Sequence, residues 1–225
     1  MRTRIVRRFF KIFYAVLTRL EVSGLENVPA AEAYILATNH MSYFDPPLLY
    51  CLIGNDQIAG FVADKYRKNL IFGSIVRLAN PIFIRRGTID RQAFDAAVQI
   101  LQAGRPFAVA PEGTRSRSGS LSRGKTGIAL LADLSKAPIL LVALTGTDKA
   151  FRELLRWRRP KLTVQFAPLF YLPPLDVRDR SESLRRNADE VMCRMAAMLP
   201  ESYRGAYANH PRLQEFLPEY SPLRE

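Results

Sequence analysis

The stretch YILATNHMSYFDPPLLYCLI, residues 34–53, decides the fold, because it joins an apolar run, a polar turn and a helical pattern in one segment. Residues 34–38 are apolar up to Thr38 and predict a strand that is covered on both faces. Pro46 suits the first turn of a helix, and the apolar residues after it predict a helix over residues 46–53. A strand that leads directly into a helix is the repeating unit of a parallel α/β sheet.

The same alternation continues after residue 53. Further strands are predicted over residues 58–63, 81–85, 107–110, 139–145 and 162–166. Helices are predicted between and after them, over residues 69–78, 91–103, 125–134, 148–156 and 181–199, and Asp90 is the expected N-cap of the helix that begins at residue 91. The sequence therefore predicts an α/β fold with a mostly parallel central sheet flanked by helices. We expect one main domain over residues 21–200 and a tail packed on its surface over residues 201–225.

The N-terminal residues 1–20, MRTRIVRRFFKIFYAVLTRL, predict an amphipathic helix that forms a separate segment. At about 100° per residue, one narrow stripe of this helix is apolar; it consists of Ile5, Phe9, Ile12, Phe13, Val16 and Leu20. Arginines and Lys11 gather on the opposite face. A broad apolar face opposite a basic one is typical of a helix that lies in the headgroup plane of a membrane. The alternative is a terminal helix that docks on the protein's own core.

The formal net charge of +12 favours anionic partners: nucleic acids, anionic lipids, or phosphorylated and CoA-bearing substrates. The sequence has no recognisable nucleic-acid-binding motif, so a nucleic-acid-binding protein is only a remote alternative. Cys51 and Cys193 lie far apart, which argues against a disulfide framework and, with no cleavable signal pattern, predicts a cytoplasmic location. No apolar run reaches the roughly 18 residues of a spanning helix, so we expect attachment to a membrane surface.

His40 is the first candidate for catalysis, because it follows the strand predicted over residues 34–38. An imidazole titrates near neutral pH and can accept a proton from a hydroxyl group. Asp45, five residues later, could fold back across the turn to orient the ring. The alternative is that Asp45 only caps a helix that begins at Pro46.

Two more polar clusters follow predicted strands. Arg85 and Arg86 end the strand at residues 81–85, and the sequence PEGTRS, residues 111–116, follows the strand at 107–110. Guanidinium groups and turn N–H groups suit phosphate oxygens, although a solvated strand end and an exposed basic loop are the alternatives. His210 has no carboxylate or serine at a useful spacing and is interpreted as structural. Because the chain has no Gly-x-Ser-x-Gly and no His-Glu-x-x-His, we expect neither a covalent serine mechanism nor a metal.

Taken in order, four blocks resemble the glycerolipid acyltransferase family, of the 1-acylglycerol-3-phosphate O-acyltransferase (lysophosphatidic acid acyltransferase) type. The first block is Asn39-His40 with Asp45, and the second is an apolar strand that ends in Arg86. The third is the PEGTRS block at residues 111–116. The fourth is a proline-led apolar strand at residues 137–142. The PEGTRS block is the most specific of the four.

The resemblance implies that His40 activates the acceptor hydroxyl and that Asp45 orients it. It also implies a set of substrate-binding residues: Lys65, Arg86, Glu112, Gly113, Thr114, Arg115 and Pro138. The implied reaction moves a fatty acyl group from acyl-CoA or acyl-carrier protein to the free hydroxyl of 1-acylglycerol 3-phosphate and gives phosphatidic acid, with no cofactor. Glycerol 3-phosphate or another lyso-lipid is the alternative acceptor. The expected place is an anionic phospholipid membrane, on the cytoplasmic face of the cell membrane, as a peripheral or monotopic protein.

Overall fold

The computed structural model describes residues 2–67, 80–84 and 90–223. This part contains a seven-stranded sheet with the order β1-β7-β6-β2-β5-β3-β4. The strands are β1 (Arg19–Ser23), β2 (Ile35–Thr38), β3 (Ala59–Ala63), β4 (Pro81–Ile84), β5 (Phe107–Val109), β6 (Ile139–Thr145) and β7 (Lys161–Phe166). All neighbouring strands pair in parallel except β6 and β7, which are antiparallel. The mostly parallel sheet and the six predicted strands are therefore confirmed.

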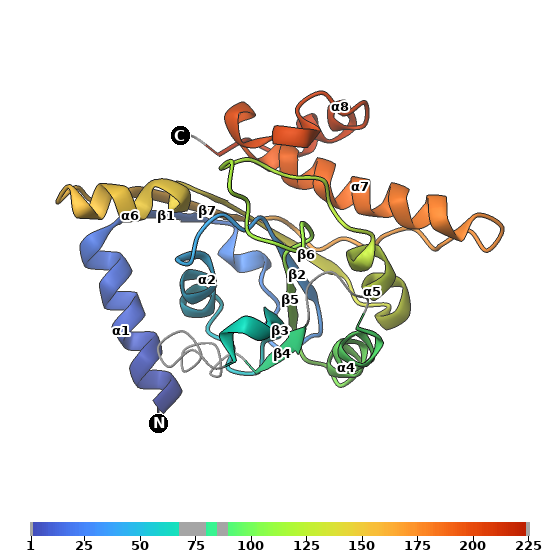
Figure 1. The fold of residues 1–225 in the computed structure, drawn as a ribbon, viewed down its shortest axis with the longest axis horizontal. Helices are drawn as coiled ribbons and strands as arrows, with labels where there is room; N and C mark the ends of the chain where they lie inside the picture. The colour runs from blue at the N-terminus through green and yellow to red at the C-terminus, as the bar shows by residue number, and fades with distance from the viewer. Residues whose placement is uncertain (1, 68–79, 85–89, 224–225) are drawn as a thin grey trace.

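Helices connect the strands and cover both faces of the sheet (Figure 1). The α-helices are α1 (Arg2–Leu17), α2 (Asp45–Ile53), α4 (Arg91–Gln102), α5 (Gly127–Ser135), α6 (Thr147–Leu155), α7 (Arg180–Met198) and α8 (Leu213–Phe216). Short 3₁₀ helices occur at Leu25–Asn27, Asp64–Tyr66, Glu201–Tyr203, Gly205–Tyr207 and Leu217–Glu219. Asp90 caps α4 as predicted, because its Oδ1 accepts a hydrogen bond from the backbone N–H of Ala93 at 3.1 Å. The helix predicted over residues 69–78 lies outside the described residues.

Strand β6 shows why the sheet has a core on each face. All of its side chains are buried, and they alternate between two apolar clusters. Ile139 and Leu141 join the cluster beneath α4, α5 and α7. Leu140 and Val142 join the cluster beneath α1, α2 and α6. The continuous apolar run in the sequence is therefore a strand covered on both faces.

Helix α1 is shorter than predicted, because it ends at Leu17 and the chain then enters β1. The prediction of a helix over residues 1–20 was therefore wrong at its C-terminal end. The guanidinium of Arg159 donates hydrogen bonds to the carbonyl oxygens of Ala15 and Thr18, at 2.9 and 2.7 Å. These bonds satisfy carbonyl groups that a helix leaves without partners at its C-terminus.

Two different faces of α1 are apolar. On the inner face Tyr14 is buried against α2, and its hydroxyl donates to the carbonyl oxygen of Phe44 at 2.7 Å. Docking on the protein's own core, the alternative considered from the sequence, therefore describes this face. On the outer face four side chains are 55–62% exposed; they are Ile5, Phe9, Ile12 and Val16. These four form the outer stripe of α1, and whether it contacts a membrane stays a prediction.

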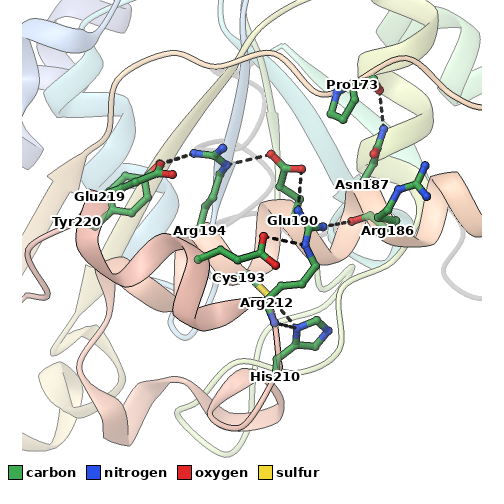
Figure 2. Close-up of polar contacts among 11 residues, drawn as sticks. Pro173, Arg186, Asn187, Glu190, Cys193, Arg194, His210, Arg212, Glu219 and Tyr220 are labelled. Atoms are coloured by element: carbon green, nitrogen blue, oxygen red, sulfur yellow. Dashed lines mark hydrogen bonds and ion pairs between the residues drawn. The ribbon is translucent and has the colours of Figure 1, made fainter.

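The segment after Pro200 packs more deeply than a surface tail. Its aromatic and aliphatic anchors are buried; they are Tyr203, Tyr207, Leu213, Phe216 and Leu223. Figure 2 shows how polar contacts join this segment to α7. Arg194 donates to Glu219 at 2.7 Å, and Arg212 donates to Glu190 at 3.2 Å. The segment therefore completes the core on the α7 face.

His210 belongs to the same set of contacts (Figure 2). Its Nδ1 lies 3.2 Å from the sulfur of Cys193, which is fully buried. Burial raises the pKa of the Cys193 thiol to about 12, so this cysteine is an unreactive neutral group at physiological pH. The surroundings of His210 agree with the structural role expected from the sequence.

Candidate active site

His40 and Asp45 meet across the turn between β2 and α2. The Nδ1 atom of His40 lies 2.8 Å from Oδ2 of Asp45. The same carboxylate oxygen accepts hydrogen bonds from the backbone N–H groups of Met41 and Ser42, at 2.8 and 2.7 Å. Asp45 is itself the first residue of α2. The alternative prediction, that Asp45 only caps a helix beginning at Pro46, was therefore wrong. The carboxylate instead folds back over the turn that carries His40.

The exposure of the two side chains suits a base and its orienting group. The Asp45 side chain is 2% exposed and that of His40 is 23% exposed. A carboxylate accepts hydrogen bonds, so the arrangement favours the tautomer with a proton on Nδ1 of His40. The remaining ring nitrogen, Nε2, is then the atom that can take a proton from a substrate hydroxyl.

Asn39 fixes the strand end from which His40 emerges. Its side chain accepts from the N–H of Leu144 and donates to the carbonyl oxygen of the same residue, both at 2.8 Å. These bonds extend the pairing of β2 with β6 beyond Thr38 and Val142. Asn39 is fully buried, so removing the amide would leave two backbone groups without partners. The sequence marked Asn39 only as part of a motif and did not predict this role.

The loop at residues 111–116 holds the backbone of His40 from both sides. The N–H of Ser116 donates to the carbonyl oxygen of His40 at 2.7 Å, and the N–H of His40 donates to Oε1 of Glu112 at 3.5 Å. The second oxygen of Glu112 accepts from the N–H and the hydroxyl of Ser122, at 2.8 and 2.6 Å. Glu112 is 2% exposed, and its burial raises the pKa of its carboxyl group. Glu112 therefore ties two loops together next to the base.

Gly113 follows Glu112 in a conformation that favours glycine. Its φ is +71°, and a Cβ at this position would lie 2.9 Å from the Cδ of Lys125. Lys125 also donates its backbone N–H to the carbonyl oxygen of Pro111 at 2.8 Å. Thr114 comes next and is exposed. The turn brings Arg115 back toward the His40 loop.

Two of the predicted cationic residues gather around Tyr43. The guanidinium of Arg115 lies over the Tyr43 ring, 4.0 Å from its centroid. The hydroxyl of Tyr66 donates to that of Tyr43 at 3.3 Å. This hydrogen bond lowers the pKa of the Tyr43 hydroxyl, and the positive charges of Arg115 and Lys65 lower the pKa further. Tyr43 is 45% exposed, so this cluster of Tyr43, Tyr66, Arg115 and Lys65 faces the surface beside the base.

Sequence reasoning selected the cations of this cluster but missed Tyr43 and Tyr66. Tyr43 stands inside the His40–Asp45 motif at a position whose identity the motif leaves free. Lys65 and Tyr66 lie in the 3₁₀ helix that directly follows β3. For Tyr66, its position next to Lys65 in the sequence was the available signal. The cluster forms because β2, β3 and β5 are parallel and end at the same edge of the sheet.

Two predicted residues do not join this arrangement. Pro138 is buried at the start of β6, where its carbonyl oxygen accepts from the N–H of Ile35 at 2.8 Å. Ile35 begins β2 and His40 follows its end, so Pro138 lies roughly 15 Å away along the strands. Its expected place on the acyl-chain side stays a prediction. Arg86 lies outside the described residues.

The arrangement combines an oriented base with cations that can bind an anion. His40 can accept a proton through Nε2, and Arg115 and Lys65 place positive charge at Tyr43, three residues after His40 in the same loop. A substrate with a hydroxyl and a phosphate a short distance apart matches this pair of functions. Within residues 2–67, 80–84 and 90–223, no cluster of His, Cys, Asp and Glu could hold a metal ion.

Several known proteins are similar to this chain in sequence. A family model described as Acyltransferase matches residues 19–145. A 1-acyl-sn-glycerol-3-phosphate acyltransferase of Limnanthes douglasii is 31% identical over 171 residues, which cover 71% of this chain and 56% of that protein. A probable 1-acyl-sn-glycerol-3-phosphate acyltransferase of Mycoplasma genitalium is 28% identical over 151 residues, which cover 62% of this chain and 56% of that protein. The chain thus spans little more than half the length of these curated relatives.

A solved structure is similar over most of the chain. It is the crystal structure of the 1-acyl-sn-glycerophosphate (LPA) acyltransferase PlsC from Thermotoga maritima. The TM-score is 0.61 with 26% sequence identity, and the match covers 84% of this chain and 76% of that one. The α/β fold described above is therefore shared with a protein of this group.

Proposed function

This chain belongs to the acyltransferase family, and from that premise we propose that it transfers a fatty acyl group to the free hydroxyl of 1-acylglycerol 3-phosphate. The product is phosphatidic acid, an intermediate of phospholipid biosynthesis. The observation that carries this proposal is the contact between His40 Nδ1 and Asp45 Oδ2 at 2.8 Å, beside the cations of the Tyr43 cluster. The names of the similar proteins from Limnanthes and Mycoplasma support the same acceptor.

The proposed chemistry is a direct transfer in which His40 acts as the base. Nε2 takes the proton of the acceptor hydroxyl while the oxygen attacks the thioester carbonyl carbon. The tetrahedral intermediate then collapses, the C–S bond breaks, and the imidazolium returns the proton to the departing thiolate. The carboxylate of Asp45 stabilises the imidazolium between these steps. Such base catalysis contributes about 10²–10⁴-fold to the rate.

The acceptor phosphate binds at the Tyr43 cluster. Arg115 supplies a planar guanidinium whose orientation is fixed by the ring of Tyr43, and Lys65 supplies a second positive charge. The Tyr66 hydroxyl adds a hydrogen-bonding group at the same place. Arg86 is expected to join these residues. The acyl donor is a thioester, acyl-CoA or acyl-carrier protein, and the reaction uses no metal or cofactor.

An anionic membrane is the proposed source of the acceptor. The outer stripe of α1 turns Ile5, Phe9, Ile12 and Val16 away from the core, and Arg4, Arg8 and Lys11 are exposed beside it. Apolar side chains flanked by cations suit the interface of a bilayer with anionic lipids. No helix among the described residues is long and apolar enough to cross a bilayer. We propose that the outer stripe of α1 holds the protein on the membrane surface, on the cytoplasmic face.

A single assay with three acceptors tests the proposal. The purified protein is incubated with radiolabelled acyl-CoA and vesicles that contain lysophosphatidic acid, lysophosphatidylcholine or, in solution, glycerol 3-phosphate. The proposal expects labelled phosphatidic acid with the first acceptor and little product with the others. A preference for glycerol 3-phosphate or lysophosphatidylcholine would assign the same chemistry to another acceptor. Lack of transfer with all three, and with acyl-carrier protein as the donor, would contradict the proposed activity.

A further inference from the structure

The end of α6 exposes more apolar surface than a solvated helix requires. Phe151 and Leu155 lie one helical turn apart and are 64% and 67% exposed, and Trp157 just after the helix is 99% exposed. We call these three residues, with the exposed Arg152, Arg156 and Arg158 between and beside them, the α6 tip. Large apolar side chains that are exposed together and flanked by polar residues mark sites of protein or membrane contact.

The backbone holds the Trp157 side chain away from the fold. Its φ is +57°, in the left-handed region that bulky residues rarely adopt. The turn is fixed by hydrogen bonds from the N–H of Trp157 to Leu154 at 3.0 Å and from the N–H of Arg158 to Glu153 at 2.9 Å. A glycine or asparagine would adopt this turn more easily. The side chain of Trp157 is therefore held almost fully exposed.

The charge of this segment selects the kind of partner. Residues 147–159 contain five cations (Lys149, Arg152, Arg156, Arg158 and Arg159) and two acids (Asp148 and Glu153). Asp148 accepts from the hydroxyl of Tyr203, and Glu153 lies 3.6 Å from Arg156 and 4.0 Å from Arg158 at the surface. Such exposed pairs contribute little, so the arginines keep most of their attraction for external anions. An indole among arginines suits the headgroup level of an anionic bilayer.

The α6 tip is continuous with the end of α1. Arg159 follows the tip directly and bonds to the last carbonyl groups of α1, where Val16 of the outer stripe is exposed. Figure 1 shows α6 extending past the C-terminal end of α1 on the same side of the molecule. The two surfaces can therefore meet one membrane.

We propose that the α6 tip is a second bilayer contact, in which Trp157 enters the headgroup region of an anionic membrane while the arginines bind its phosphates. Contacts on two different helices fix the orientation of the protein, whereas α1 alone would leave it free to rotate about the helix axis. The inference concerns membrane attachment and does not depend on the acyl transfer proposed above.

Tryptophan fluorescence tests this proposal directly, because Trp157 is the only tryptophan in the chain. The emission of the full chain is measured with vesicles of phosphatidylcholine alone and of phosphatidylcholine with phosphatidylglycerol, and sedimentation records binding. We expect a blue shift with the anionic vesicles and quenching by lipids brominated near the headgroup. Vesicle-bound protein whose emission remains that of a solvated indole would overturn the proposal, and would leave a protein partner as the occupant of this surface.

Variants provide a second readout. Leu155→Ser should lower the partition onto anionic vesicles about tenfold, since it removes an apolar contact of roughly 1.5 kcal/mol. Val177→Ser is the matched control, because Val177 is 94% exposed and lies outside both α1 and α6. Thermal unfolding confirms that both variants fold. Equal vesicle binding by the two variants would contradict the α6 contact, and neither result bears on whether the protein transfers acyl groups.

Discussion

At the scale of single residues, the site depends on one carboxylate oxygen. Oδ2 of Asp45 faces His40 Nδ1 and also accepts from the N–H groups of Met41 and Ser42. Three donors on one buried oxygen fix both the turn and the ring. The His40–Asp45 contact could be predicted from spacing and chemistry, because the two residues are only five positions apart in the sequence.

Arg115, which lies over the ring of Tyr43, is the proposed partner of the acceptor phosphate. Arg115→Ala should raise the KM for lysophosphatidic acid by about tenfold or more, with a smaller change in the KM for acyl-CoA, because it removes a charge from the phosphate site. A larger effect on the donor would place Arg115 on the CoA side instead.

A pair of substitutions at Tyr43 separates orientation from charge. Tyr43→Leu removes the ring beneath the Arg115 guanidinium and should raise the KM for lysophosphatidic acid several-fold, with kcat nearly unchanged. Tyr43→Phe keeps the ring and should restore most of the affinity. Equal KM values for both variants would contradict a positioning role for the ring, and kinetics at several acceptor concentrations measure the difference.

At the scale of elements, the Asn39 side chain holds the chain to Leu144 just beyond the last paired residues of β2 and β6. Asn39→Ala should lower the free energy of unfolding by about 1–3 kcal/mol for each Leu144 backbone group left unpaired, and should also lower kcat because His40 loses its support. Denaturant unfolding and steady-state kinetics measure the two effects.

Asn27→Ala is the matched control for this prediction. The Asn27 side chain also bonds to a strand, through the carbonyl oxygen of Phe166 at 3.0 Å, but in a different part of the sheet. Asn27→Ala should lower the free energy of unfolding without a comparable loss of kcat. If Asn39→Ala lowers the free energy of unfolding but leaves kcat unchanged, then Asn39 supports the fold and not the base.

The elements that the sequence predicts well are those with buried apolar runs. β6 and β2 could be predicted because both faces of each strand are covered, so that each strand is a continuous apolar run in the sequence. β1 was missed because its sequence, RLEVS, is mostly exposed at the sheet edge and has no such run. Because β1 was not recognised, the predicted N-terminal helix extends to residue 20, past its observed end at Leu17. The Tyr43 cluster could not be predicted because it joins side chains from segments that only the parallel sheet brings together.

At the scale of the whole molecule, α1 joins the proposed membrane contact to the site. Its inner face reaches the His40 turn through the hydrogen bond from Tyr14 to Phe44 at 2.7 Å, while its outer stripe faces away from the core. Deleting the helix would therefore also uncover the core next to the base. Substitutions on the outer stripe alone give a cleaner test.

The double variant Phe9→Ser and Ile12→Ser should reduce binding to anionic vesicles by about a hundredfold, because each side chain contributes roughly 1.5 kcal/mol when it enters the bilayer interface. Transfer to short-chain acceptors in solution should change little. Tyr171→Ser, at another exposed aromatic residue, is the control. Vesicle binding equal to that of the control, measured by sedimentation, would remove the outer stripe from the contact.

The steady-state rate of the His40→Ala variant tests the central claim most directly, measured with lysophosphatidic acid in anionic vesicles and acyl-CoA. Because His40 is the proposed base, kcat should fall by at least about 10²-fold, while vesicle binding and the unfolding midpoint stay close to those of the unsubstituted protein. A kcat within a few-fold of that protein's value would show that another group removes the proton, and the account of this site would be wrong.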